Sequence, residues 1–261
     1  MNLPVNIKNA YDTPERFPRL LADRISFGTR FGFYWRFLGV VIRSRKKALR
    51  NQLGYGPWAA SSQEVFRNIE GCGGKFHISG MENLKKCKGP VVFISNHMGT
   101  LETMIFPGLI APVMKVTFVV KDSLVTHPIF GPIMRSRNPI VVSRSNSRED
   151  LQKVITEGQQ LLADGISLVI FPQSTRTMGF DPAHFNSLGT KLASKAGVQV
   201  VPVAVKTDYW GNGKWIKELG PINRKKPIYI KFGEPMDVTG NGREQHLEII
   251  RFIQTWLEKW K

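Results

Sequence analysis

From about Lys75 onward, short runs of β-branched and aromatic residues alternate with longer amphipathic stretches. The short apolar runs predict buried strands, and apolar residues three and four positions apart predict helices. We expect strands at 75–79, 91–95, 116–120, 140–143, 167–171, 200–205 and 228–232, and helices at 58–70, 102–110, 151–162, 188–196 and 247–260. This alternation indicates an α/β fold with a largely parallel sheet covered by helices on both faces.

The stretch 25–45 combines a wide apolar helical face with a basic end. Its apolar positions are Phe27, Phe31, Tyr34, Trp35, Leu38, Val41 and Ile42, flanked by Phe33, Phe37 and Val40. The basic residues that follow are Arg43, Arg45, Lys46, Lys47 and Arg50. Such a helix can lie in a membrane surface, with its rings at headgroup depth and its cations on anionic lipid. The alternative is a helix packed on the protein's own core, and we favour the membrane.

These patterns divide the chain into two parts. We expect residues 1–70 to form an N-terminal helical, membrane-interfacial segment and residues 71–261 to form the α/β domain. Residues 1–24 support no firm structural prediction. No stretch reaches the roughly 18–20 apolar residues that span a bilayer, and no signal peptide is evident. We therefore expect association with a membrane surface without a spanning helix.

Composition narrows the class of partner. The 261 residues are 42% hydrophobic and 22% charged, which is typical of a folded protein. The net charge of +17 favours an anionic partner: nucleic acid, a membrane surface or a phosphorylated substrate. The aromatic residues cluster near the N-terminus instead of alternating with Lys and Arg, which argues against nucleic acid. Cys72 and Cys87 form no C-x-x-C pair, so we expect reduced thiols and no structural metal.

The central apolar run, 91–95, ends in polar residues that suggest chemistry. His97 follows this expected strand, and Glu102 follows five residues later. On one continuous helix this spacing would turn the two side chains about 140° apart, because each residue advances ~100°. If the helix begins near Gly99–Thr100, Glu102 can fold back and orient one imidazole nitrogen while the other acts as a general base. A purely structural histidine is the alternative.

Three cationic residues also follow expected strands: Lys121, Arg144 and Arg176. Because loops at the carboxyl ends of parallel strands carry function, we expect them near His97. The two arginines could hold a phosphate by paired hydrogen bonds. Backbone N–H groups around Ser174 and Thr175 could add donors. One base, its orienting acid and several cations fit an acyl transfer near a phosphate.

Four motifs in order resemble those of the glycerolipid acyltransferase family, of the 1-acylglycerol-3-phosphate acyltransferase type. Asn96-His97-(x4)-Glu102 looks like H-x4-D, and Phe171-Pro172-Gln173-Ser174-Thr175-Arg176 looks like F-P-E-G-T-R. Lys121, with Pro128, Gly131 and Arg144, is similar to the second motif, and Val201-Pro202-Val203 to the fourth. The chain departs from the pattern in Glu102 for Asp, Gln173 for Glu and Ser174 for Gly.

The resemblance implies an αβα acyltransferase domain at the cytoplasmic face of a membrane. It implies an O-acyltransferase with His97 and Glu102 as catalytic pair and Lys121, Arg144, Gln173, Ser174, Thr175 and Arg176 binding substrate. The donor would be acyl-CoA or acyl-carrier protein, with no cofactor and no metal. The expected acceptor is a lysophospholipid, foremost 1-acylglycerol 3-phosphate. The alternatives are glycerol 3-phosphate, a lyso-aminolipid, an inactive lipid-binding relative, or a basic nucleic-acid-binding protein.

Overall fold

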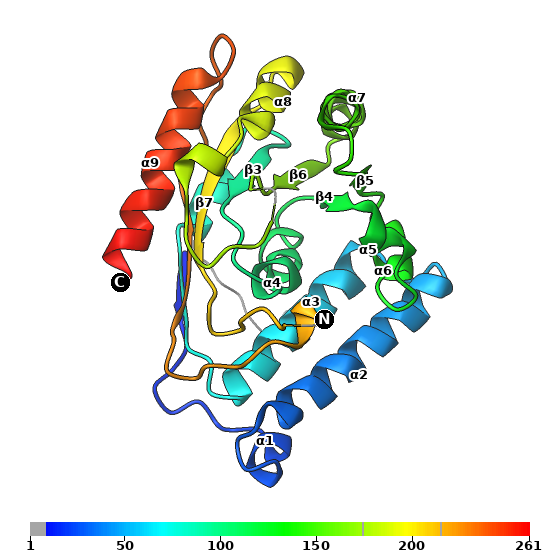
Figure 1. Cartoon of the computed structure of the whole chain (residues 1–261), viewed down its shortest axis with the longest axis vertical. Helices are drawn as coiled ribbons and strands as arrows, with labels where there is room; N and C mark the ends of the chain where they lie inside the picture. Colours follow the sequence, from blue (N-terminus) through cyan, green and yellow to red (C-terminus); the bar gives the residue numbers. More distant parts are fainter. Residues whose placement is uncertain (1–8, 174, 215) are drawn as a thin grey trace.

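The computed structural model describes residues 9–173, 175–214 and 216–261, and is built around an eight-stranded sheet (Figure 1). The strands are β1 (Ala10–Asp12), β2 (Phe76–Ser79), β3 (Val92–Ser95), β4 (Val116–Lys121), β5 (Ile140–Val142), β6 (Ser167–Ile170), β7 (Val200–Lys206) and β8 (Ile228–Phe232). All seven strands expected from the sequence are present to within a residue at each end. The eighth, β1, is a three-residue edge strand, too short to carry a detectable period.

Helices connect the strands. They are α1 (Leu21–Ile25), α2 (Arg30–Leu49), α3 (Tyr55–Gly71), α4 (Leu101–Ile110), α5 (Asp122–Thr126), α6 (Gly131–Arg135), α7 (Ser147–Ala163), α8 (Leu188–Ala196) and α9 (Arg243–Lys259). Three short 3₁₀ segments are η1 (Met81–Lys86), η2 (Pro182–His184) and η3 (Lys217–Leu219).

The strand order places the end of β3 in the middle of the sheet. The order is β1-β2-β8-β7-β3-β6-β4-β5. Strands β3, β4, β5, β6 and β7 run parallel to one another, whereas β8 is antiparallel to β7 and parallel to β2. Loops that follow β6, β3 and β7 therefore meet at one edge of the sheet, and the loop after β3 lies between the other two.

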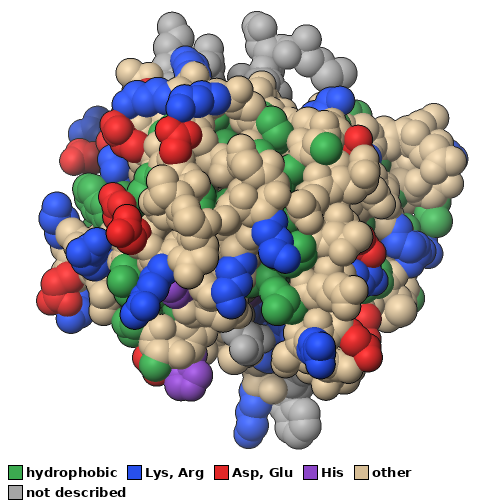
Figure 2. All heavy atoms as spheres, turned by 90° about the horizontal axis from the view of Figure 1, so that it is seen from above, with side chains coloured by type: hydrophobic (Ala, Val, Ile, Leu, Met, Phe, Trp, Pro, Cys, Tyr) green, Lys and Arg blue, Asp and Glu red, His purple; other side chains and the backbone are tan. Residues whose placement is uncertain are grey.

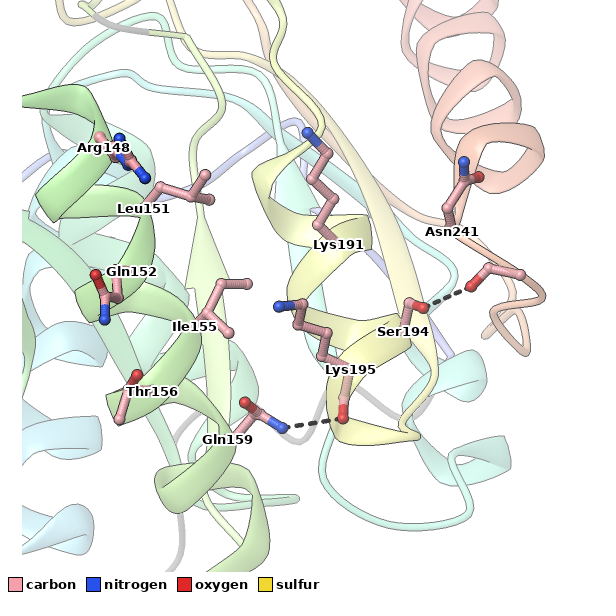
Figure 3. A pocket seen from close by; sticks show the side chains of 11 residues that line it. Arg148, Leu151, Gln152, Ile155, Thr156, Gln159, Lys191, Ser194, Lys195 and Asn241 are labelled. Carbon is pink, nitrogen blue, oxygen red and sulfur yellow. Dashed lines mark hydrogen bonds between the residues drawn. The ribbon is translucent and has the colours of Figure 1, made fainter.

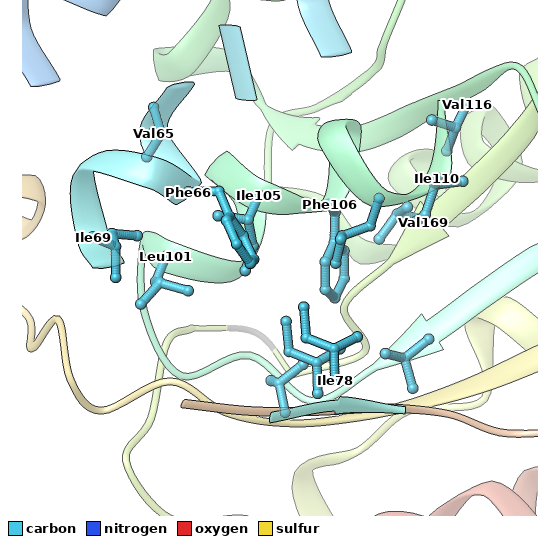
Figure 4. Packing of buried hydrophobic residues seen from close by; sticks show 14 of the residues in the cluster. Val65, Phe66, Ile69, Ile78, Leu101, Ile105, Phe106, Ile110, Val116 and Val169 are labelled. Carbon is cyan, nitrogen blue, oxygen red and sulfur yellow. The ribbon is translucent and has the colours of Figure 1, made fainter. Parts of the chain in front are cut away.

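Helices cover both faces of the sheet, as the alternation predicts (Figure 1). Along the central strand, Val91 and Phe93 belong to the core shared with α2, α3 and α4. Their neighbours Val92 and Ile94 point to the opposite face, into the core shared with α7, α8 and α9. Figure 4 shows the first core, where side chains of α3 and α4 meet those of the sheet. This two-sided burial explains the uninterrupted apolar run at 91–94.

Pro107 lies inside α4, where a proline tends to kink or end a helix, yet α4 continues past it to Ile110. In a regular helix the Gly108 N–H would donate to the Met104 carbonyl, but here the hydroxyl of Ser62, on α3, lies between these two groups. It accepts a hydrogen bond from the Gly108 N–H at 2.8 Å and donates one to the Met104 carbonyl at 2.6 Å. A neighbouring helix thus satisfies the groups that a proline disturbs.

The N-terminal aromatic stretch is not one helix. Phe27 and Gly28 have positive φ angles of 50° and 72°, and this break separates α1 from α2. One face of α2 packs inward. The rings of Phe33 and Phe37 lie edge-on to the ring of Trp210, with centroids 4.9 and 5.0 Å from its centroid. Residues of α2 and α3 share one core with the sheet, so the expected boundary at residue 70 does not separate two cores.

The other face of α1 and α2 is open to solvent and strongly apolar. Phe27 is 95% exposed, Phe31 74% and Trp35 78%. Exposed apolar side chains continue this surface, which we call the N-terminal apolar face; the further members are Leu21, Ile25, Leu38, Ile42 and Leu49. Along α2 their spacing, 31-35-38-42-49, keeps them on one side of the helix. The helix therefore packs on the core and still leaves a large unpartnered apolar face.

On the face of the molecule shown in Figure 2, positive charge is spread out and does not form one patch. Figure 2, which looks down on the view of Figure 1, shows Lys and Arg side chains at many separate places on this face, with acidic side chains between them.

In the parts of the chain that the structure describes, no helix is both long and apolar enough to cross a membrane.

Candidate active site

His97 and Glu102 form a buried hydrogen-bonded pair. Helix α4 begins at Leu101, so His97 lies in the loop before the helix and Glu102 in its first turn. Glu102 Oε1 lies 2.8 Å from His97 Nδ1. The side chain of Glu102 is fully buried, whereas His97 is 8% exposed. The expectation that the acid folds back onto the imidazole is confirmed in its geometry.

Glu102 is held as a carboxylate by several donors. Its Oε1 also accepts hydrogen bonds from the N–H groups of Met98 at 2.7 Å and Gly99 at 2.8 Å. Its Oε2 accepts one from the hydroxyl of Thr207 at 2.7 Å. Burial by itself raises the pKa of Glu102, but the bond and charge of His97, with the Gly99 and Thr207 bonds, hold that pKa below its usual value. The acid therefore stays ionised at neutral pH and binds Nδ1–H, which leaves Nε2 to take a proton.

A stacking contact also holds the face of the His97 imidazole ring. The ring of Phe171, at the end of β6, stacks on His97 with ring centroids 4.2 Å apart and planes 21° apart. Phe171 in turn stacks on Phe106 and Phe118. An aromatic platform and an acid thus restrict both the tilt and the rotation of the base.

The loop after β6 is attached directly to the loop that carries His97. Gln173 is buried, and its Oε1 accepts a hydrogen bond from the His97 N–H at 2.7 Å. Its amide nitrogen donates to the Thr177 hydroxyl at 2.6 Å, and Thr177 N–H donates to the His97 carbonyl at 3.0 Å. Gln173 thus joins the two loops through both ends of its amide, and the substrate binding expected of it remains a prediction.

Arg176 lies within this joined pair of loops. Its guanidinium donates to the Thr100 hydroxyl at 3.1 Å and to Glu218 Oε1 at 2.9 Å. Thr100 lies three residues from His97, at the start of α4, so the cation is anchored beside the loop that carries His97. Sequence position alone did not indicate Glu218, which comes from η3 in the segment between β7 and β8.

The other expected substrate-binding residues lie farther out. Lys121 ends β4, and Arg144 follows β5; both side chains are exposed. Strands are about 4.8 Å apart, so β5 lies roughly 14 Å from β3 across three strand spacings. Arg144 has a positive φ of 62°, and its N–H donates to Asp150 at 2.7 Å. Thr175 is exposed near Lys217, and Ser174 lies outside the described residues. Substrate binding by these four remains a prediction.

Three polar residues to which the sequence assigned no role support the site. Thr207 follows β7 and bonds to Glu102. Both ends of the Asn96 amide bond to the backbone of Val205, at 2.8 and 2.9 Å, which ties the loop after β3 to β7. Asn212 donates to the Met98 carbonyl at 2.9 Å. Asn96 is next to His97 in the sequence, and this position could have indicated its role. Nothing in the sequence indicated Thr207 or Asn212, because only the tertiary structure brings them close to His97 and Glu102.

Replacing Thr207 by Val is expected to lower kcat about tenfold with little change in KM. The variant keeps the shape of the side chain but removes a hydrogen bond to a buried carboxylate, worth about 1.5 kcal/mol or more. Steady-state kinetics of acyl transfer test this, and Thr207→Ser, which keeps the hydroxyl, is the matched control. A Thr207→Val enzyme with wild-type kcat would show that Glu102 needs no help from β7.

The two cysteine thiols are poor nucleophiles. Cys72 and Cys87 are both free, as the sequence predicts. Burial raises the pKa of Cys72 to about 12 and that of Cys87 to about 11. Both therefore remain protonated at neutral pH, and since the thiolate is the reactive form, neither is suited to accept an acyl group.

A surface groove of 830 Å³ lies away from this site, between α7 and α8 (Figure 3). Lys191 and Lys195 of α8 and Leu151 and Ile155 of α7 line it. None of the described site residues contributes to the groove. The base, the acid and Arg176 are instead gathered at the sheet edge by direct hydrogen bonds between loops.

Comparison with known proteins shows which family this chain resembles. A model of the acyltransferase family matches residues 75–206. A 1-acyl-sn-glycerol-3-phosphate acyltransferase of Pseudomonas aeruginosa is 29% identical over 186 residues, which are 71% of this chain and 68% of that protein. One from Chlamydomonas reinhardtii is 31% identical over 148 residues, 57% of this chain and 41% of that protein.

The fold has a solved counterpart. The crystal structure of a 1-acyl-sn-glycerophosphate acyltransferase from Thermotoga maritima superposes with a TM-score of 0.61 at 19% identity, covering 91% of both chains. That likeness concerns the fold alone. The family model, in contrast, spans half of the sequence and includes His97, Glu102 and Arg176. This chain therefore belongs to the acyltransferase family.

Proposed function

We propose that this enzyme transfers a fatty acyl group from a thioester donor to the free hydroxyl of 1-acylglycerol 3-phosphate, giving phosphatidic acid. The observation that carries the proposal is the position of Arg176. Its guanidinium is bonded to Thr100, within the same loop and helix start that hold His97 and Glu102. A cation beside the base suits an acceptor whose phosphate is close to its reacting hydroxyl. The names of the relatives above support the same acceptor.

In the proposed reaction, His97 Nε2 removes the proton from the acceptor hydroxyl. The oxygen attacks the thioester carbonyl, and the carbon–sulfur bond breaks as the ester forms. The departing thiolate takes the proton back from the imidazolium. Glu102, kept ionised by its donors, stabilises the charged imidazolium between these steps. His97 therefore ends the reaction in the protonation state in which it began, and no group on the protein becomes acylated.

The donor in this proposal is acyl-CoA or acyl-carrier protein. The defining experiment offers the purified enzyme both donors against 1-acylglycerol 3-phosphate, glycerol 3-phosphate, a lyso-aminolipid and monoacylglycerol. We expect phosphatidic acid as the main product, with the monoacylglycerol reaction at least tenfold less efficient. Transfer to the lyso-aminolipid with none to 1-acylglycerol 3-phosphate would refute the proposed acceptor and leave the acyltransferase class intact.

We further propose that the N-terminal apolar face lies on a membrane surface, where a lysophospholipid acceptor resides. Its rings are exposed and in line. The same helix and its C-terminal cap carry exposed cations, at Arg30, Arg43, Lys46, Lys47 and Arg50. Apolar side chains entering the headgroup region and cations meeting anionic lipid act together in such binding.

Changing Phe31, Trp35 and Leu38 together to Ser is expected to weaken binding to anionic liposomes at least 100-fold. Each buried apolar side chain of this size contributes about 1.5–3 kcal/mol, and 1.4 kcal/mol is a factor of ten. Liposome flotation measures the effect. The control is Leu151→Ser with Leu247→Ser, two exposed apolar residues on α7 and α9. Unchanged flotation of the triple variant would place the membrane contact elsewhere.

A further inference from the structure

The cation that the proposed function assigns to the acceptor phosphate already has an anionic partner. Glu218 Oε1 lies 2.9 Å from the Arg176 guanidinium. The pair is shielded from solvent, because the Arg176 side chain is 16% exposed and that of Glu218 26%. A pair so placed is screened less than one on the open surface. A phosphate that binds Arg176 must therefore compete with a carboxylate of the protein.

The backbone of Glu218 is held firmly while its side chain remains at the edge of the site. The Glu218 carbonyl accepts a hydrogen bond from the indole N–H of Trp210 at 3.0 Å. Trp210 is fully buried against Phe33 and Phe37 of α2. The Gly220 carbonyl accepts a second bond to α2, from the Tyr34 hydroxyl at 2.6 Å. Displacing the carboxylate thus requires only rotation of the Glu218 side chain, with no unfolding of the segment.

We propose that Glu218 is a specificity-determining residue that competes with the substrate phosphate for Arg176. This inference rests on the proposed function. The competition weakens binding of any phosphate-bearing acceptor but leaves a neutral acceptor unaffected. It applies equally to the product, because phosphatidic acid keeps the same phosphate. Return of the Glu218 carboxylate to Arg176 then assists the release of product.

The test is Glu218→Gln, which keeps the shape and an oxygen acceptor but removes the charge. We expect KM for 1-acylglycerol 3-phosphate to fall about 3- to 10-fold, since hydrogen bonds to a charged partner are roughly twice as strong as neutral ones. The inhibition constant of phosphatidic acid should fall by a similar factor. KM for monoacylglycerol should not change.

The matched control is Glu248→Gln, which removes the same charge from an exposed position on α9 and should leave all three constants at wild-type values. A Glu218→Gln enzyme whose KM rises, or changes equally for both acceptors, would show that Glu218 merely supports its segment and would overturn the inference. If Glu218→Gln does not fold, Glu218→Asp, whose shorter carboxylate reaches Arg176 less well, should lower the phosphate-acceptor KM about two- to threefold.

The same data separate this inference from the function on which it rests. If the wild-type enzyme transfers no acyl group to 1-acylglycerol 3-phosphate, the proposed function fails, and the inference fails with it. If the wild-type enzyme does so but Glu218→Gln leaves its KM and product inhibition within twofold of wild type, only the inference fails.

Discussion

His97→Ala is expected to lower kcat for acyl transfer by a factor of about 10²–10⁴, the usual contribution of a positioned general base. The physical reason is that the acceptor hydroxyl would have to lose its proton to water. His97 is 8% exposed and contacts Phe171, so the smaller alanine side chain leaves a space beside Phe171. The one charge that loses its His97 partner is that of Glu102. Steady-state kinetics with saturating donor measure the loss, and circular dichroism verifies the fold.

Two variants of Glu102 are the controls for this result. Glu102→Gln keeps the size but removes the charge that stabilises imidazolium, whereas Glu102→Asp keeps the charge at a greater distance. We expect Gln to be the more damaging change, because the carboxylate is the partner of Nδ1. A His97→Ala enzyme that keeps more than a tenth of wild-type activity while folded would remove His97 from the chemistry.

Arg176→Ala is expected to lower kcat/KM for 1-acylglycerol 3-phosphate about 10- to 100-fold. A charge-assisted hydrogen bond contributes roughly 1.5–3 kcal/mol, and 1.4 kcal/mol is a factor of ten. The loss should lie toward the upper value, because removing Arg176 leaves the Glu218 carboxylate near the phosphate without its partner. The decisive comparison is with monoacylglycerol, which lacks the phosphate and should lose much less.

Arg176→Lys separates charge from geometry. Lysine keeps the positive charge but cannot bond to Thr100 and an anion with one planar group. We expect an intermediate loss with the phosphate-bearing acceptor. Equal losses for both acceptors in Arg176→Ala would mean that Arg176 only holds its loop to Thr100, and the phosphate-acceptor proposal would then fail.

The fold was predictable because its strands are buried on both faces. A strand such as β3, with Val92 and Ile94 facing one helical layer and Phe93 the other, must be apolar throughout, and such a run is visible in sequence. The edge strand β1 was not, because three residues with one aromatic carry no period. The antiparallel direction of β8 agrees with the connection from β7, whose described residues contain η3 and no crossover helix.

In the site, local spacing indicated the His97–Glu102 pair, because five residues that span a loop and a first helical turn bring the two groups together by short-range geometry. The contacts that Gln173 makes between the two loops could not be predicted, for the opposite reason. Its partners, the His97 N–H and the Thr177 hydroxyl, are set by how two loops meet, and nothing in the spacing of the motif specifies that meeting.

The sequence was sufficient for the pairing of His97 with Glu102 and for the apolar strands, because each depends on neighbours along the chain or on a repeat of two to four residues. The tertiary structure decided which face of α2 packs inward, which donors keep Glu102 ionised and which anion neutralises Arg176. Thr207 lies 105 residues from Glu102, and Glu218 lies 42 from Arg176. Contacts at such separations arise from strand order and loop packing, and these depend on the free energy of the whole core.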